Sequence, residues 1–229
     1  FFFQAEDGIR DAREWLEFRR VLFRSVFPEE AKTWSDNILD LIRKKVSQNK
    51  KIIGIGEIGL DYYWDKTFID LQKEIFIKQI KLANELNLPI NVHDREAHKD
   101  TFDIIKEHND QSKSKVVLHC FSGSLEFANK CIKEGWFISL GGVVTFKNAK
   151  KMKEVAQNID ENFLLLETDA PYLTPHPYRG TTNQPAYTRL VAEEIARLRE
   201  SSTEHIMETT TNNAYKVFKF WKKKDLIHI

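Results

Sequence analysis

The stretch KIIGIGEIGLDYY, residues 51–63, decides the fold, because an apolar run passes directly into glycines and acidic residues. Its first part, Lys51–Ile55, predicts a short strand, and Glu57 follows at the strand's end. Near-continuous apolar runs are typical of parallel strands that are covered on both faces. The stretch therefore predicts a strand of a parallel sheet with a carboxylate at its carboxyl end.

Similar apolar runs recur along the rest of the chain, and amphipathic stretches separate them. The further strand candidates are Pro89–His93, Lys115–His119, Phe137–Leu140 and Phe163–Glu167. One helical stripe of core-facing residues runs through Ile75, Phe76, Ile80, Ala83 and Leu86, and another through Tyr187, Leu190, Val191, Ile195 and Leu198. This alternation predicts an α/β fold of the TIM (β/α)8-barrel type. A closed barrel needs eight strands, so five candidates predict an incomplete barrel that lacks about the first three strands.

Residues 1–25 show no such pattern. The segments QAEDGIRD, residues 4–11, and RVLFRS, residues 20–25, resemble translated sequencing adapters. We therefore expect residues 1–25 to be a non-native or disordered extension, followed by one domain over residues 26–229. The alternative is a short amphipathic helix over residues 10–23, whose periodicity is poor.

Composition limits the class of protein. The formal net charge is +1, so any contact with nucleic acid must depend on a local patch or on metal ions. The chain has no apolar run of about 18 residues and no signal-peptide pattern, which predicts a cytoplasmic protein without membrane contact. Cys120 and Cys131 are too few for a disulfide framework and are expected to be reduced core residues. No feature of the sequence indicates an obligate protein partner.

Polar residues follow four of the five predicted strands. They are Glu57, His93 with Arg95 two positions later, His119 and Asp169. Active sites of (β/α) barrels lie at the carboxyl ends of the strands. Two imidazoles and two carboxylates suit zinc, manganese or magnesium, and a pair of such ions can activate water for phosphodiester hydrolysis. These residues therefore predict a divalent-metal site.

Each of these residues also has an ordinary structural explanation. A histidine at a strand end can simply be hydrogen-bonded, and a carboxylate after a strand can cap a helix. The occurrence of all four at strand ends favours the metal site. His176 lies between two prolines and is expected in a rigid loop. The other histidines are expected on the surface, and they are His98, His108, His205 and His228.

Four motifs, GEIGLDYY, VHDR, LHCFSG and ETDAPYL, together with NNAYKVF near the C-terminus, resemble the TatD-type metal-dependent deoxyribonucleases, a branch of the amidohydrolase-like barrels. The resemblance covers residues 26 to about 221. It implies a hydrolase that cleaves DNA with two divalent ions, as a 3′ to 5′ exonuclease. It implies that Glu57 bridges the ions, that His93 and His119 bind one of them, and that Asp169 binds the other and positions the attacking water. Glu57 and Asp169 are thus the catalytic candidates.

Two further residues receive roles at this implied site. Arg95 is a candidate contact to the substrate phosphate, since a guanidinium suits bidentate phosphate binding, although it can equally be a solvated surface residue. Asp61 is expected to orient a metal ligand.

The sequence also departs from the family's pattern. A His-x-His strand begins the family's barrel, and none precedes Glu57 here. The segment VFPEEA, residues 26–31, resembles the family's segment after its third strand, with Phe27 where a histidine is usual. The resemblance therefore implies an N-terminally truncated chain, and an unpaired sheet edge predicts poor stability.

Two other functions stay open. A small-molecule amidohydrolase or lactonase can use the same barrel and often carries a carbamylated lysine on a central strand, which none of the five strand ends offers. The other alternative is a catalytically inactive barrel fragment.

Overall fold

A computed structural model describes residues 34–49, 52–64 and 66–218 of the chain. The expected extension over residues 1–25, the VFPEEA segment and His228 lie outside the described residues. The expected division at residue 26 therefore stays a prediction.

The described chain is an α/β protein whose strands alternate with helices. Five strands are hydrogen-bonded in chain order, β1-β2-β3-β4-β5, and the β1–β2 and β4–β5 pairs are parallel. The predicted α/β class with five parallel strands is confirmed. The absence of about three further strands stays a prediction, because the part of the chain before residue 34 is not described. The chain divides into two compact units between Val117 and Leu118, and each is described by itself.

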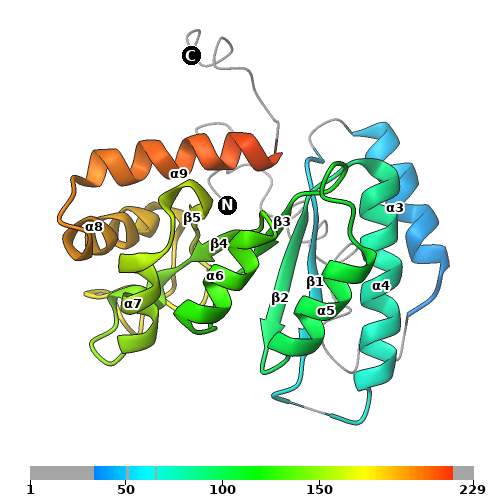
Figure 1. Cartoon of the computed structure of the whole chain (residues 1–229), viewed down its shortest axis with the longest axis horizontal. Coiled ribbons are helices and arrows are strands. Elements are labelled where there is room, and N and C mark those ends of the chain that lie inside the picture. Colours follow the sequence, from blue (N-terminus) through cyan, green and yellow to red (C-terminus); the bar gives the residue numbers. More distant parts are fainter. Residues whose placement is uncertain (1–33, 50–51, 65, 219–229) are drawn as a thin grey trace, which may run out of the picture. The chain divides into compact units, whose positions relative to one another are not determined.

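In its described residues, the N-terminal unit contains three helices and the first strands of the sheet. Its elements are α3 (Asn37–Gln48), β1 (Ile55–Asp61), α4 (Ile69–Leu86), β2 (Ile90–Arg95) and α5 (His98–His108), and β3 (Val116–Leu118) follows at the boundary. Figure 1 shows α4 on the side of β1, which it contacts, whereas α5 packs against β2. The predicted core stripe of α4 is confirmed for Ile75, Phe76, Ile80 and Ala83, which are at most 1% exposed, whereas Leu86 is only half-buried. Helices α4 and α5 thus support the two strands that carry the first candidate residues.

The first strand differs from its prediction. Lys51–Ile55 was expected as the strand, whereas β1 begins at Ile55 and runs through Glu57 to Asp61. The register against β2 shifts between Gly56 and Ile58, so the strand continues past an irregularity. Gly59 has a φ of 141°, and a Cβ atom there would collide with the His93 carbonyl oxygen. Glycine therefore allows β1 to lie close against β2, and Glu57 lies within the strand instead of at its tip.

The C-terminal unit, as far as Phe218, contains the remaining strands and four helices. Its elements are α6 (Leu125–Lys133), β4 (Phe137–Leu140), α7 (Lys150–Asn158), β5 (Leu164–Leu166), α8 (Thr188–Leu198) and α9 (Thr203–Phe218), with short 3-10 turns at Gly142–Thr145, Glu161–Phe163 and Pro185–Tyr187. The Ser124 hydroxyl caps α6 by accepting a hydrogen bond from the Phe127 amide at 3.2 Å. The predicted β4 matches the structure in both bounds, and the strand is buried throughout.

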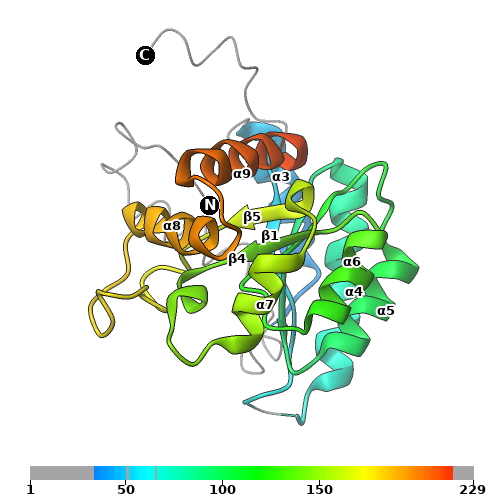
Figure 2. The same cartoon turned by 60° about the vertical axis from the view of Figure 1, so that its left-hand side comes forward.

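Helix α9 packs against β5, and Figure 2 shows α8 and α9 beside this strand. Asn213, from the NNAYKVF motif, is 1% exposed, and its Nδ2 donates to the carbonyl oxygens of Glu161 at 2.7 Å and Leu164 at 2.9 Å. A buried carbonyl needs such a donor, so this asparagine holds the start of β5 in place. The strand in turn leads into the ETDAPYL segment.

Two smaller expectations can be compared with the structure. Cys131 is buried as expected, whereas Cys120 is partly exposed. Among the helices described, none has the length and apolarity needed to cross a membrane.

Candidate functional site

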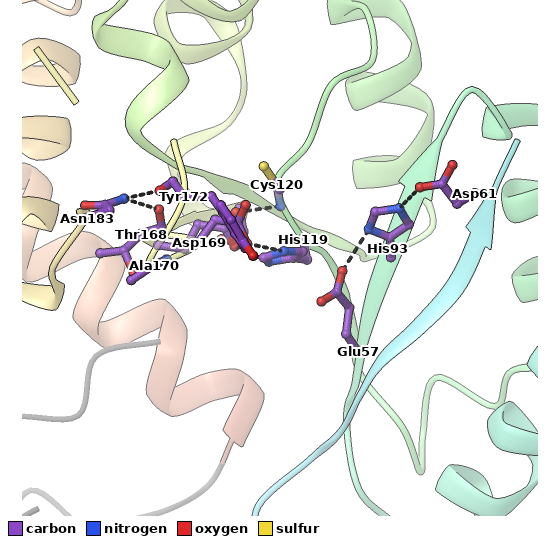
Figure 3. A network of polar contacts seen from close by, with 12 residues as sticks. Glu57, Asp61, His93, His119, Cys120, Thr168, Asp169, Ala170, Tyr172 and Asn183 are labelled. Carbon is purple, nitrogen blue, oxygen red and sulfur yellow. Dashed lines mark hydrogen bonds and ion pairs between the residues drawn. The ribbon is translucent and has the colours of Figure 1, made fainter. Parts of the chain in front are cut away.

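In the N-terminal unit, His93 of β2 lies between two carboxylates. Its Nδ1 is 2.8 Å from Glu57 Oε1, and its Nε2 is 3.1 Å from Asp61 Oδ2 (Figure 3). The two carboxylates differ in exposure, because the Asp61 side chain is 1% exposed and the Glu57 side chain 35%. An inner, buried carboxylate and an outer, accessible one therefore flank one imidazole.

This arrangement requires a cation or an added proton. A neutral imidazole carries one N–H, and an ionised carboxylate only accepts hydrogen bonds. If His93 Nε2–H donates to Asp61, a lone pair on Nδ1 faces the Glu57 oxygen. Two acceptors at 2.8 Å need a proton or a metal ion between them. The pair Glu57 and His93 thus offers one oxygen and one nitrogen to a cation, while Asp61 fixes the orientation of the ring.

Asp61 is well suited to this orienting role. Burial raises the pKa of its carboxyl group, but hydrogen bonds from His93 and from the Tyr63 amide, the latter at 2.9 Å, outweigh burial and hold the pKa below its usual range. Gln72 of α4 completes the local anchoring by pairing with the Asp61 backbone through both its amide atoms, at 3.0 and 3.2 Å. The carboxylate is therefore ionised and fixed in position.

In the C-terminal unit, His119 shows the same pattern. The residue directly follows β3, and its Nδ1 is 2.8 Å from Glu167 Oε2, while its Nε2 is 3.5 Å from Asp169 Oδ1. The Glu167 side chain is 3% exposed and that of Asp169 25%. Glu167 is thus the inner carboxylate, and Asp169 is the outer one that can share a cation with His119.

Glu167 is a residue whose role the sequence analysis missed, because it was assigned only to the end of a strand. Its Oε1 accepts a hydrogen bond from the Cys120 amide at 2.6 Å, and its Oε2 accepts one from the Ser139 hydroxyl at 2.7 Å. Burial raises the pKa of Glu167, but the charge and hydrogen bond of His119 and the hydroxyl of Ser139 outweigh it and lower the pKa. The available signal was a carboxylate, in LLLETD, that directly follows three buried leucines.

The loop after β5 holds Asp169 in an uncommon backbone conformation, with a φ of 55°. Asn183 stabilises this loop, since its Nδ2 donates to the carbonyl oxygens of Thr168 at 2.6 Å and Tyr172 at 2.7 Å (Figure 3). Asn183 is 4% exposed, and its own amide donates to the Pro171 carbonyl. This residue too was not predicted, because nothing in the local sequence pattern links it to a loop 15 positions earlier.

Arg95 lies at the end of β2 and is partly exposed. Its guanidinium carbon lies 3.9 Å from the centre of the Tyr63 ring and 5.3 Å from that of Trp64. The proposed contact between Arg95 and phosphate stays a prediction, although the residue lies only two positions beyond His93.

The donor atoms suit a hard or borderline divalent ion, because imidazole nitrogen and carboxylate oxygen are ligands of zinc, manganese and magnesium. Glu57 with His93 supplies one such donor pair, and His119 with Asp169 supplies another. In the part of the chain that is described, no group of three or more His, Cys, Asp and Glu residues is arranged to hold a metal ion. Glu57 and His93 lie in one unit and His119 and Asp169 in the other, and each unit is described by itself. That all four residues share one site therefore stays a prediction.

The other histidines differ among themselves. His176 and His205 are exposed, and His205 Nε2 lies 3.1 Å from Glu161 Oε2. His98 and His108 are half-buried instead of fully exposed, and His98 Nδ1 lies 2.8 Å from Asp94 Oδ2. The rings of His98 and His205 therefore each have a carboxylate partner nearby.

The known proteins that the chain resembles are TatD-related or metal-dependent hydrolases. A family model described as TatD related DNase matches residues 10–219. The chain is 50% identical over 176 residues to the uncharacterized metal-dependent hydrolase YabD of Bacillus subtilis, covering 77% of this chain and 69% of YabD. It is 39% identical over 175 residues to the uncharacterized metal-dependent hydrolase YcfH of Escherichia coli, covering 76% of this chain and 66% of YcfH. The matches thus span about two thirds of these relatives. The family match also begins before residue 26, within the expected extension.

Solved structures show the same relationship at the level of the fold. The crystal structure of YJJV, a TatD homolog from Escherichia coli, matches with a TM-score of 0.80 at 29% identity over 90% of this chain and 83% of that chain. An uncharacterized amidohydrolase from Saccharomyces cerevisiae matches with a TM-score of 0.66 at 20% identity over 80% of this chain and 70% of that chain, which supports the fold alone.

Proposed function

The chain belongs to the family of TatD-related DNases, and from this premise we propose that it is a metal-dependent hydrolase that cleaves DNA phosphodiester bonds from the 3′ end. One observation carries the proposal: each of two histidines, His93 and His119, lies between a buried carboxylate and an accessible one. A structural histidine needs only one such partner, whereas a metal ligand benefits from a second carboxylate that fixes its ring.

The proposal assigns the accessible groups to metal binding. Glu57 and His93 from one unit, and His119 and Asp169 from the other, would hold two divalent ions, with magnesium, manganese and zinc as the candidates. When bound, such ions lower the pKa of water and offset negative charge on the phosphate oxygens.

The remaining roles belong to the protein's own residues. Asp61 and Glu167 each accept the inner N–H of a histidine and so leave its outer nitrogen unprotonated. Asp169 accepts a hydrogen bond from the attacking water and orients it toward the phosphorus. Arg95 donates to a non-bridging phosphate oxygen. Together these residues hold the substrate and the attacking water in position for cleavage of the scissile P–O bond.

The direct test is digestion of single-stranded DNA that carries a label at its 5′ end, in the presence of manganese. The parent chain should shorten the strand stepwise from the 3′ end. Glu57→Ala and Asp169→Ala should each lower the rate by about 100-fold or more, because the first removes a metal ligand and the second also removes the group that positions the attacking water. His205→Ala removes an exposed histidine that contacts Glu161 and serves as the matched control, with the parent's rate expected.

Other results would replace the proposal. Cleavage that survives in Glu57→Ala would show that the assigned residues do not carry the reaction. Hydrolysis of lactones or cyclic amides in place of DNA would make the chain a small-molecule amidohydrolase. If no substrate is cleaved while the chain is folded and manganese is present, the chain is an inactive barrel fragment.

A further inference from the structure

Two exposed aromatic side chains directly follow β1 in the N-terminal unit. Tyr63 is 49% exposed and Trp64 is 64% exposed, and their ring centres lie 4.8 Å apart at an interplanar angle of 89°. The Arg95 guanidinium covers the Tyr63 ring at 3.9 Å. The two neighbouring rings together form an exposed aromatic patch, and contiguous apolar patches are the surface features that mark binding sites.

The backbone under this aromatic cluster is firmly held. The Tyr62 amide donates to the Arg95 carbonyl oxygen at 2.9 Å, and the Tyr62 hydroxyl donates to Asp100 Oδ2 at 2.8 Å. The Tyr63 amide donates to Asp61 Oδ1, and the other oxygen of the same carboxylate contacts His93 Nε2. One buried carboxylate therefore fixes both the cluster and the first candidate metal ligand, which makes the cluster a built feature of this edge of the sheet.

The chemistry of the cluster suits a nucleotide. A nucleobase stacks on an aromatic ring whatever its sequence, and a guanidinium can stack on a ring while its N–H edge donates to phosphate. In the described part of the chain, the Arg95 guanidinium forms no hydrogen bond or ion pair with a side chain. With a net charge of only +1, the protein has no general attraction for a polyanion, so binding must come from local contacts of this kind.

We propose that Tyr63, Trp64 and Arg95 form a binding subsite for single-stranded nucleic acid, in which an unpaired base stacks on the Trp64 ring and Arg95 contacts an adjacent phosphate. The subsite deepens the proposed function, because it would hold the strand beside His93. A base inside a duplex has both faces covered by its neighbours, so the subsite favours frayed or single-stranded ends.

The test measures binding without catalysis. A fluorescein-labelled oligothymidylate of about ten nucleotides, within the usual site size for such surfaces, is titrated with the full chain in EDTA and followed by anisotropy. A strand of the same length that carries abasic sites throughout is the second probe. The unmodified chain should bind the base-containing strand about tenfold more tightly than the abasic one. Equal affinity for the two strands would overturn the proposal without any variant.

Variants then separate stacking from charge. Trp64→Leu should weaken binding of the base-containing strand about tenfold and leave the abasic strand unchanged, whereas Trp64→Phe should retain most of the affinity. Arg95→Ala should weaken both strands and reduce the slope of log K against log salt by about 0.7, the value for one phosphate contact on a single strand. Arg189→Ala, which removes an exposed arginine paired with Glu193 on α8, is the matched control.

Two results would overturn the subsite. One is unchanged binding in Trp64→Leu, and the other is an equal loss for both strands, which would show a general electrostatic or folding effect. Thermal melting of each variant guards against the latter, and Trp64 is 64% exposed, so its replacement removes little buried surface. Because EDTA prevents cleavage, binding is measured separately from activity. Base-dependent binding by a chain that cleaves no DNA would support the subsite and contradict the proposed nuclease. Cleavage of DNA by a chain whose binding does not depend on the bases would support the nuclease and contradict the subsite.

Discussion

Replacing Glu167 by glutamine tests the account of the His119 side of the site, because the change keeps the shape and removes the charge. In the protein, Glu167 Oε1 accepts from the Cys120 amide, and Oε2 accepts from both His119 and Ser139. Glutamine has one oxygen and one NH2 group, so it cannot accept on both sides. One side must therefore lose its acceptor.

The size of the effect depends on whether the Cys120 amide or the His119 ring loses its acceptor. If the amide NH2 faces Cys120, a buried N–H is left without an acceptor, which costs about 1–3 kcal/mol. If it faces His119, the ring must accept at Nδ1 and so becomes protonated at Nε2, the nitrogen that faces Asp169. A loss of about 2 kcal/mol in unfolding free energy lowers the melting midpoint by about 4–8 °C in a chain of this size. The change of tautomer weakens metal binding by about 10–100-fold.

The assay is a pair of thermal melts and a manganese titration by calorimetry, on the parent and on Glu167→Gln. Glu194→Gln is the control, because Glu194 pairs with Lys153 and Arg197 near the surface of its unit. Such a partly exposed ion pair contributes about 1 kcal/mol or less. A Glu167→Gln variant that melts with the parent and binds manganese equally well would refute the argument that this carboxylate fixes the His119 ring.

Three further predictions concern the residues around the two histidines. Asp61→Asn should weaken manganese binding about 10–100-fold in calorimetry, whereas Asp40→Asn, on the exposed side of α3, should not change it, and equal losses would contradict a specific role for Asp61. Asn183→Ala removes two hydrogen bonds to partly buried carbonyls and should lower stability by about 2 kcal/mol, with faster amide exchange over residues 168–172, and unchanged exchange there would show that the loop is held otherwise. Glu167 and Asp61 both have a lowered pKa in the folded chain, so their contribution to stability is complete above their ordinary pKa values of 4.5 and 3.8 and is lost as the pH falls through the lower folded values. Urea midpoints measured from pH 7 to pH 3 should therefore fall, and less steeply in Glu167→Gln, whereas identical slopes would contradict the assignment.

Much of the fold could be predicted from the apolar runs. Phe137–Leu140 was predicted without error, because a short run of buried side chains between polar residues leaves little choice of bounds. The α4 stripe was equally clear, since its burial follows the helical period. The first strand was displaced by several residues, because its glycines do not indicate the register shift between Gly56 and Ile58 or the close approach of Gly59 to β2.

The site was only partly predictable for a similar reason. Glu57, His93, His119 and Asp169 follow apolar runs, so local pattern indicated them, and the structure brings them together as two pairs. Glu167 and Asn183 act through partners far away in the sequence, and a hydrogen bond over such a separation leaves no local signal. Burial of a charged side chain is visible only once the chain is folded. Buried carboxylates beside strand-end histidines are therefore the part that needed the structure.

The most direct test of the central claim is the metal content of the chain, by elemental analysis after equilibration with manganese or zinc and removal of unbound ions. We expect at least one ion per parent chain, the same content in His205→Ala, and none when His93 and His119 are both replaced by alanine. A double variant that retains the parent's metal content would show that the ions lie elsewhere and would contradict the assignment of these two histidines as ligands.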